Sequence, residues 1–281
     1  MEPREREVTV EIDSRRTGVR YYDAGEGEPV VLLHGAGIDA AGVSFRYSLP
    51  ALAETNRVLA PDLPGHGASE KPDVGYTTGY FREALASFLD AVGVDRASLV
   101  GVSLGGAVAL GVALAAPTRV RRLALVSSYG LGADAAWRPG ASVGLRLPWF
   151  DQAFWTGMTG SRASLRAALS GLVGGAVPED LLADVARLVE DPAVGRTLTR
   201  WQRSEFLPTG LRTDHRSELA GLGVPTLLVH GRRDPLLPAD WSREAARRLP
   251  EAETAVFESC GHWVPREAPR AFNRRLGAFL A

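Results

Sequence analysis

A serine between two glycines stands where an apolar stretch gives way to a helical pattern. The segment GVSLG at residues 101–105 follows the apolar run 98–102 and precedes a run of small apolar residues. A G-x-S-x-G in this setting is typical of a tight turn that lifts the serine hydroxyl clear of a sheet, because Cβ atoms in place of the glycines would clash. The pattern predicts Ser103 as a nucleophile. A glycine-rich packing turn with a buried serine is the alternative interpretation.

A serine hydroxyl is a poor nucleophile at neutral pH unless a base takes its proton. His262 lies between the last expected strand and the last expected helix, and we expect it to be that base. Asp234 follows the expected strand 226–229 and should orient the imidazole without itself being protonated. Asp214 and Asp240 are alternative acids. The order serine, aspartate, histidine, each after a separate strand, is more specific than any one of these motifs.

The tetrahedral intermediate of acyl transfer needs hydrogen-bond donors for its oxyanion. The segment HGAG at residues 34–37 follows the apolar run 30–33 and is well placed to supply one. We expect the backbone N–H groups of Ala36 and Leu104 to form the oxyanion hole. His34 is expected to hold this loop in place and not to take part in catalysis.

Short apolar runs, separated by helical patterns, would bring these residues to one edge of a sheet. Eight runs are expected to be strands: 8–12, 19–22, 30–33, 57–60, 98–102, 122–126, 226–229 and 254–257. Four segments are expected to be helices: 79–92, 104–116, 239–249 and 265–280. The first two strands, joined by a loop containing Gly18, should enter the sheet as an antiparallel pair. The alternation predicts an α/β fold with a mostly parallel eight-stranded sheet flanked by helices.

The strand rhythm stops between residues 130 and 215, where helix formers, glycine and aromatic residues dominate. We interpret this segment, 130–215, as a helical cap inserted into a core formed by residues 1–129 and 216–281. Large apolar side chains of the cap and of the histidine loop could line a substrate pocket. The candidates are Trp149, Phe154, Trp155, Trp201 and Trp263.

The composition favours a small-molecule partner. Thirty-two Lys and Arg stand against 33 Asp and Glu, so no net field favours nucleic acid or an anionic membrane. The single cysteine, Cys260, excludes an intramolecular disulfide and a zinc site built from several thiolates. Neither a signal peptide nor an apolar run of about 18 residues is found, so a cytoplasmic protein is expected. A monomer and a homodimer are both compatible with the sequence.

These residues resemble the α/β-hydrolase superfamily over nearly the whole chain. The segment VLAPDLPGHG at 58–67 and the ending GHW at 261–263, through Phe272 and Asn273, are similar to its group of lid-bearing serine esterases and meta-cleavage-product hydrolases. The resemblance implies a hydrolase with no metal and no organic cofactor, whose substrate binds between sheet and cap. Serine at the nucleophile position departs from haloalkane dehalogenases and epoxide hydrolases, which have aspartate there.

The first hypothesis for the reaction is hydrolysis of a carboxylic ester with a small to medium, apolar substrate. Hydrolysis of a carbon–carbon bond, as in meta-cleavage-product hydrolases, or of a lactone is the alternative. The tryptophan after the expected catalytic histidine, Trp263, is a feature shared with those carbon–carbon hydrolases. The residue before the serine, Val102, and the loop segment AGID at 36–39 differ from their usual pattern. Arg200 and Arg203 could hold a substrate carboxylate or could simply be solvated. A ligand-binding receptor on the same fold is the non-enzymatic alternative.

Overall fold

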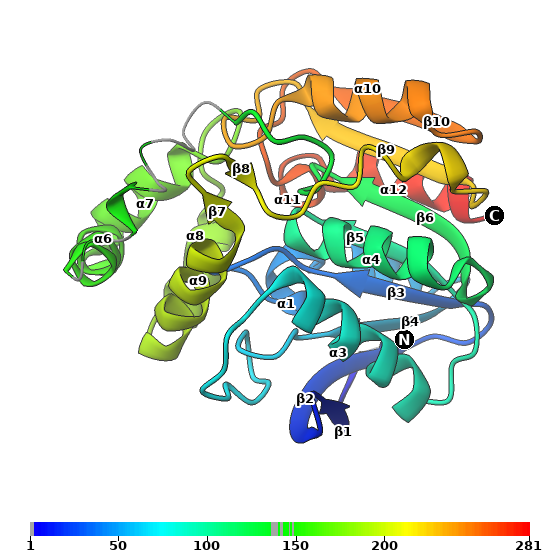
Figure 1. The fold of residues 1–281 in the computed structure, drawn as a ribbon, viewed down its shortest axis with the longest axis horizontal. Coiled ribbons are helices and arrows are strands. Elements are labelled where there is room, and N and C mark those ends of the chain that lie inside the picture. Colours follow the sequence, from blue (N-terminus) through cyan, green and yellow to red (C-terminus); the bar gives the residue numbers. More distant parts are fainter. Residues whose placement is uncertain (1–2, 136–139, 141–142, 146, 148) are drawn as a thin grey trace.

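A single twisted sheet forms the centre of the molecule (Figure 1). The computed structural model describes residues 3–135, 140, 143–145, 147 and 149–281. In this part of the chain eight strands pair in the order β1-β2-β4-β3-β5-β6-β9-β10. They are β1 (Arg4–Ile12), β2 (Arg15–Ala24), β3 (Pro29–Leu33), β4 (Arg57–Pro61), β5 (Ala97–Val102), β6 (Val120–Val126), β9 (Thr226–Gly231) and β10 (Ala252–Phe257). Only the pairs β1–β2 and β2–β4 among them are antiparallel, so the predicted mostly parallel α/β sheet is confirmed.

The turn between β1 and β2 differs from the prediction. Gly18 lies inside β2, opposite Thr9, and the turn is made by Asp13 and Ser14. Both turn residues have positive φ, 49° and 62°, as a two-residue hairpin of the favoured twist requires. The expectation of a loop at Gly18 was wrong because short polar side chains can also adopt the left-handed conformation.

Helices cover both faces of the sheet. On one face α3 (Thr78–Ala91), α4 (Leu104–Ala115) and α10 (Ala239–Arg248) share an apolar core with Leu99 of β5. On the other face α1 (Ala41–Ser44), α2 (Ser48–Leu52) and α12 (Pro269–Leu280) share a core with Val100. Adjacent strand residues enter opposite cores because side chains alternate across a sheet. The 3₁₀ turns η1 (Pro117–Arg119) and η2 (Leu219–Gly221) complete the connections.

The helix predicted over 265–280 is divided in two. A four-residue helix, α11 (Val264–Glu267), is followed by Ala268, and Pro269 then opens α12. Pro269 disfavours helical geometry in the residue before it, and Ala268 has φ −136° and ψ 54°. The break leaves Glu267 free to accept hydrogen bonds from the N–H groups of Gly261 and Trp263. This carboxylate therefore organises the loop that contains His262.

A set of helices lies beyond one end of the sheet, within the segment predicted to be a cap (Figure 1). They are α6 (Phe150–Thr159), α7 (Arg162–Ser170), α8 (Glu179–Leu188) and α9 (Pro192–Glu205), followed by the small hairpin of β7 (Phe206–Leu207) and β8 (Gly210–Leu211). The exact domain boundaries stay a prediction.

Glu205, at the end of α9, ties this helix to the core. Its fully buried carboxylate accepts hydrogen bonds from the N–H of Thr78, the hydroxyl of Tyr129, and the N–H and hydroxyl of Thr213. Four neutral donors compensate the burial of one charge. The contact fixes α9 against the start of α3 and against the loop after β6.

Arg266 forms a second tie, on the opposite side. Its buried guanidinium donates to Asp184 at 3.0 Å, to Asp180 at 2.7 Å and to the carbonyl of Val43 at 2.6 Å. The two aspartates belong to α8, so this ion pair network fixes α8 against α1 and α11. Together with Glu205 it holds the helices over the carboxyl ends of the strands.

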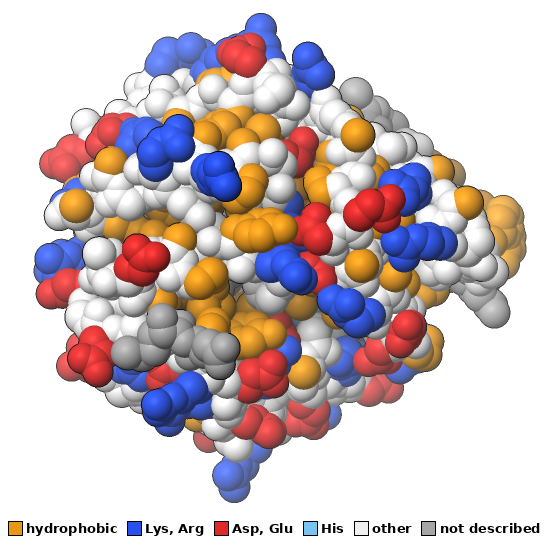
Figure 2. Space-filling view, turned by 180° about the vertical axis from the view of Figure 1, so that it is seen from behind, with side chains coloured by type: hydrophobic (Ala, Val, Ile, Leu, Met, Phe, Trp, Pro, Cys, Tyr) orange, Lys and Arg blue, Asp and Glu red, His pale blue; other side chains and the backbone are white. Residues whose placement is uncertain are grey.

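Acidic and basic side chains are mixed over the surface seen in Figure 2. Figure 2 shows basic and acidic side chains interspersed with apolar ones over the face seen from behind, as expected for a net charge of −1. No helix in the described ranges has the length and apolarity needed to cross a membrane.

Candidate active site

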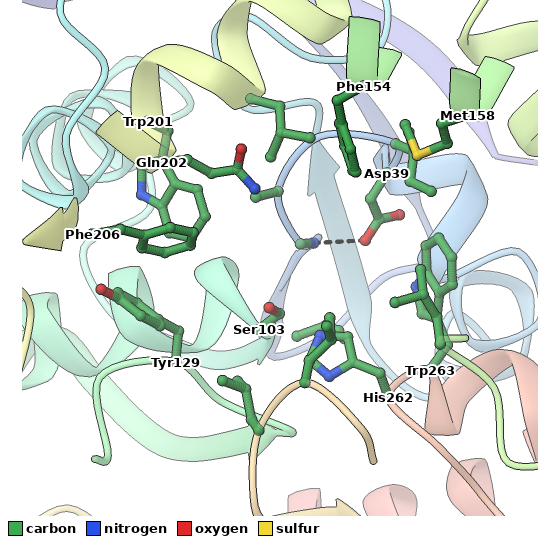
Figure 3. Close-up of a pocket in the computed structure, with 18 residues that line it drawn as sticks. Asp39, Ser103, Tyr129, Phe154, Met158, Trp201, Gln202, Phe206, His262 and Trp263 are labelled. Carbon is green, nitrogen blue, oxygen red and sulfur yellow. Dashed lines mark hydrogen bonds between the residues drawn. The ribbon is translucent and has the colours of Figure 1, made fainter. Parts of the chain in front are cut away.

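A cavity of about 260 Å³ lies between the carboxyl ends of the strands and the helices beyond them. Ser103 and His262 line it from the core, and Phe154 of α6 and Trp201 of α9 line it from above (Figure 3). Residues separated by about 160 positions in the chain therefore share one wall, because parallel strands end at the same edge of a sheet.

Ser103 occupies a strained turn between β5 and α4. Its φ of 53° and ψ of −115° lie in a region that non-glycine residues rarely adopt. The turn is held because the N–H of Ser103 donates to Val126 of β6 and the carbonyl of Ser103 accepts from Gly106 and Tyr129. The side chain is thereby presented to the cavity, at the start of a helix.

Gly105 permits the close approach of α4 to β3. A Cβ at this position would lie 2.2 Å from the carbonyl oxygen of Leu33 and 2.5 Å from that of His34. Both atoms belong to the backbone and cannot turn aside as a side chain can. Gly105 therefore packs directly against the backbone at the end of β3, which leaves no room for a side chain at this position.

We expect Gly105→Ala to lower the free energy of unfolding by about 1–3 kcal/mol or more, because an added methyl group forces α4 away from the sheet. Equilibrium denaturation with urea measures this. Gly157→Ala is the matched control, because Gly157 lies in α6 with no atom within 4 Å of its added Cβ. Equal stability of the two variants would contradict this account of the turn.

Asp234 lies against His262. The Nδ1 of His262 is 2.7 Å from Oδ2 of Asp234, whose side chain is fully buried. The other oxygen, Oδ1, accepts from the N–H groups of Leu236 and Leu237. Since a carboxylate only accepts hydrogen bonds, Nδ1 of His262 carries the proton and Nε2 is left to act on a substrate or a hydroxyl.

Asp234 and His262 shift each other's pKa values. Burial by itself raises the pKa of Asp234, but the charge of His262 and hydrogen bonds from His230 and His262 outweigh burial and place the pKa well below its ordinary value. Burial likewise lowers the pKa of His262, but the charge of Asp234 and the hydrogen bond to it raise the pKa above its ordinary value of 6.5. Asp234 is therefore ionised throughout the physiological range.

The loop of residues 34–37 is fixed by hydrogen bonds on both sides of Ala36. The N–H of Gly35 donates to Oδ2 of Asp39 at 2.7 Å, and that of Gly37 donates to Nε2 of His66 at 3.1 Å. Ala36 lines the cavity between them. Leu104 is the first residue of α4, where an N–H has no acceptor within the helix.

His34 lies in the interior and supports this loop. Its Nε2 accepts from the N–H of Leu63, and its Nδ1 contacts the carbonyl of Gly35. His66 contacts the carbonyl of Pro64 through Nδ1, and burial lowers the pKa of His66 to about 3. The two rings connect the loop after β3 to the loop after β4.

Three residues of the site were not found from the sequence. His66 supports the loop, Asp39 lines the cavity beside it, and His230 contacts Oδ2 of Asp234 at 3.2 Å. Asp39 and His66 follow strands β3 and β4 closely and lie in the segments AGID and VLAPDLPGHG, but neither pattern gave them a role in the site. His230 lies in β9, where a histidine in an apolar run gives no indication of its partner.

The predicted pocket residues divide into two groups. Phe154, Trp201 and Trp263 line the cavity, whereas Trp149 and Trp155 are absent from its described lining. Trp149 is 63% exposed before α6, and the ring of Trp155 packs against Gly195 of α9. Successive helical residues differ by about 100° in direction, so Phe154 and its neighbour point to different surroundings.

The alternative acids and the two cap arginines are absent from the described lining of the cavity. Asp214 pairs with Arg216 and Asp240 pairs with Arg243, so neither alternative acid is the partner of His262. The guanidinium of Arg200 pairs with Asp73 and donates to the carbonyl of Val74. Arg203 donates to the carbonyl of Leu145. Within the described ranges no group of three or more His, Cys, Asp or Glu side chains could hold a metal ion.

Comparison with known proteins agrees with this geometry. The family model of the alpha/beta hydrolase fold matches residues 28–269. A 2-hydroxymuconate semialdehyde hydrolase of Pseudomonas putida is 33% identical over 92% of this chain and 89% of its own length.

Two solved structures have the same fold over their whole length. A serine hydrolase involved in carbazole degradation has a TM-score of 0.82 and 26% identity, with 99% of each chain covered. A 2-hydroxy-6-oxo-6-phenylhexa-2,4-dienoate hydrolase of Rhodococcus sp. has a TM-score of 0.80 and 28% identity, again with 99% of each chain covered.

Proposed function

The chain belongs to the α/β-hydrolase fold family and is a hydrolase, and on this premise we propose that it cleaves a carbon–carbon bond beside a ketone. The proposed substrate class is a conjugated diketone, in which a second carbonyl group stabilises the carbon that leaves. The contact of His262 with Asp234 beside Ser103, in one cavity, is the observation that supports a hydrolytic mechanism most directly. The carbon–carbon hydrolases to which the chain is similar favour this bond over an ester bond.

In the proposed mechanism Ser103 adds to the ketone carbon while His262 takes the hydroxyl proton. The N–H groups of Ala36 and Leu104 bind the oxyanion. The carbon–carbon bond then breaks, its electron pair passes to the conjugated fragment, and His262 returns the proton to that fragment. Water, deprotonated by His262, releases the acyl group from Ser103 as a carboxylic acid. One water is consumed, and each step uses the same base.

Ester hydrolysis is the second candidate, because the described cavity wall is largely apolar and suits a neutral ester. Its side chains include those of Leu198, Trp201 and Phe206. The acyl-enzyme would form in the same way, with an alkoxide in place of the carbon leaving group. The first hypothesis from the sequence thus stays open, although the similar proteins support its alternative better.

The test compares the two bonds directly. Purified protein is given 2-hydroxy-6-oxohepta-2,4-dienoate, its uncharged carboxamide, and 4-nitrophenyl butanoate. We expect acetate to be released from at least one diketone, with a kcat/KM at least about tenfold above that for the ester. Turnover of the ester alone would replace the proposal with the second candidate.

The pH profile gives an independent test of the base. His262 must be neutral to accept a proton. Burial lowers its pKa, but the charges of Asp234, Asp39 and Glu267 together raise the pKa above 6.5. Because a raised pKa keeps the imidazole protonated to higher pH, kcat/KM should fall as the pH drops through a midpoint above 6.5. Stopped-flow or steady-state rates between pH 5 and 9 measure the midpoint, and a midpoint below 6.5 would contradict the assignment.

A further inference from the structure

Asp39 places a carboxylate in the wall of the cavity, beside the proposed oxyanion loop. It follows β3 by six residues, lines the cavity and is only 2% exposed. In Figure 3 its carboxylate lies on the side of Ser103 that also holds Met158 and Trp263. Tyr129, Trp201 and Phe206 lie on the opposite side. The two halves of the cavity therefore differ in charge.

The hydrogen bonds around Asp39 all run toward it. Gly35 and Ala40 donate their N–H groups at 2.7 and 2.8 Å, and the hydroxyl of Ser44 lies 2.6 Å from Oδ2. The indole N–H of Trp263 donates to the same hydroxyl at 2.8 Å. Because an indole N–H can only donate, Ser44 accepts from Trp263 and directs its own proton to Asp39.

This arrangement suits an ionised carboxylate. An ionised carboxylate has about four acceptor positions, and the three donors leave about one position for a further donor. Within the described ranges Asp39 has no ion-pair partner, and its donors are uncharged. The negative charge therefore acts on whatever occupies this half of the cavity.

Among the described lining residues only His262 can carry a positive charge. Its Nδ1 already faces Asp234, and as a neutral base it does not offset the charge of Asp39 for a bound anion. Met158, Phe154 and Ile38 are apolar, and Trp263 already donates its N–H to Ser44. Against a largely apolar cavity wall, like charges a few ångströms apart repel, whereas a donor facing a carboxylate is stabilised. A site can select by repulsion as well as by attraction.

We propose that Asp39 is a specificity-determining residue, selecting substrates whose end beside it is uncharged and donates a hydrogen bond, and disfavouring substrates with a carboxylate there. This inference rests on the proposed function, since it describes the substrate of the same cavity. It predicts that an amide, alcohol or enol end is preferred over an acid of the same shape.

Binding to Ser103→Ala tests this without turnover. Calorimetry gives the Kd of 2-hydroxy-6-oxohepta-2,4-dienoate and of its carboxamide, which has the same shape but no charge. We expect the carboxamide to bind at least about tenfold more tightly than the acid. In the double variant Ser103→Ala with Asp39→Asn, the ratio of the two Kd values should fall to about one.

Ser44→Ala, in the same Ser103→Ala background, is the matched control. It removes one hydrogen bond but keeps the carboxylate, so the preference for the carboxamide should persist. An acid that binds Ser103→Ala as tightly as the carboxamide overturns the proposal, even if Asp39→Asn fails to fold. A preference unchanged by Asp39→Asn, or no binding of either compound, overturns it as well. Absence of carbon–carbon cleavage by the wild type would contradict the proposed function alone, because the Kd ratio is measured separately.

Discussion

Ser103→Ala is expected to lower kcat/KM by about 10,000-fold or more, whatever bond the enzyme cleaves. The hydroxyl is the atom that forms the acyl-enzyme in the proposed mechanism, and no other group can replace it. Removal of a serine nucleophile leaves only the catalysis due to binding and the oxyanion donors. The rate is measured on the diketones and on 4-nitrophenyl butanoate, and a fluorophosphonate probe should label the wild type and not the variant.

Ser98→Ala provides the control for this substitution. Ser98 is a buried serine at the other end of the same strand, β5, remote from the cavity. Its replacement should leave kcat/KM within about threefold of the wild type. If Ser103→Ala kept more than about a tenth of the activity, or if labelling persisted, Ser103 would not be the nucleophile.

Asp234→Asn is expected to lower kcat by about 10,000-fold, as loss of the orienting carboxylate does in other triads. Oδ2 of Asp234 receives the proton of His262 at 2.7 Å. An amide that turned its NH₂ group toward His262 would favour the wrong tautomer, in which Nε2 carries the proton and cannot accept one. Steady-state rates at pH 8 measure the loss, with KM expected to change much less than kcat.

Two other aspartates serve as controls for this prediction. Asp240 pairs with Arg243 at the surface, and Asp214 pairs with Arg216 where both are partly buried. Neither aspartate contacts His262, so Asp214→Asn and Asp240→Asn should change kcat by less than about threefold. A large loss in either variant, with little loss in Asp234→Asn, would show that the acid had been assigned to the wrong residue.

Local patterns were sufficient to predict the eight strands of the central sheet. Runs such as 98–102 and 226–229 are apolar because parallel strands are buried on both faces. A short stretch of sequence is therefore enough to recognise such a strand. The elbow at Ser103 was equally readable, since glycine is required wherever a backbone approaches another backbone as closely as Gly105 approaches Leu33. The catalytic roles themselves stay predictions.

Conformational details at chain reversals were less predictable. Two polar residues, Asp13 and Ser14, make the first turn although Gly18 stands nearby. The helix predicted over 265–280 has a proline at its first position, which a continuous helix allows. The structure nevertheless breaks this helix before a second proline, Pro269. In each case several conformations are locally allowed, and pairing or packing with distant segments selects one.

The sequence by itself therefore determined the eight strands of the sheet, the main helices between them, and the positions at which chemistry-bearing residues leave the sheet. Only the tertiary structure decided that Asp234, and neither Asp214 nor Asp240, contacts His262. Likewise it alone separated Phe154, which lines the cavity, from Trp155, which is absent from the described lining, and placed Asp39 in the wall. The physical reason is the separation along the chain. Strand and elbow patterns depend on neighbouring residues, whereas contacts across the cavity depend on how helices from a distant part of the chain pack over the sheet.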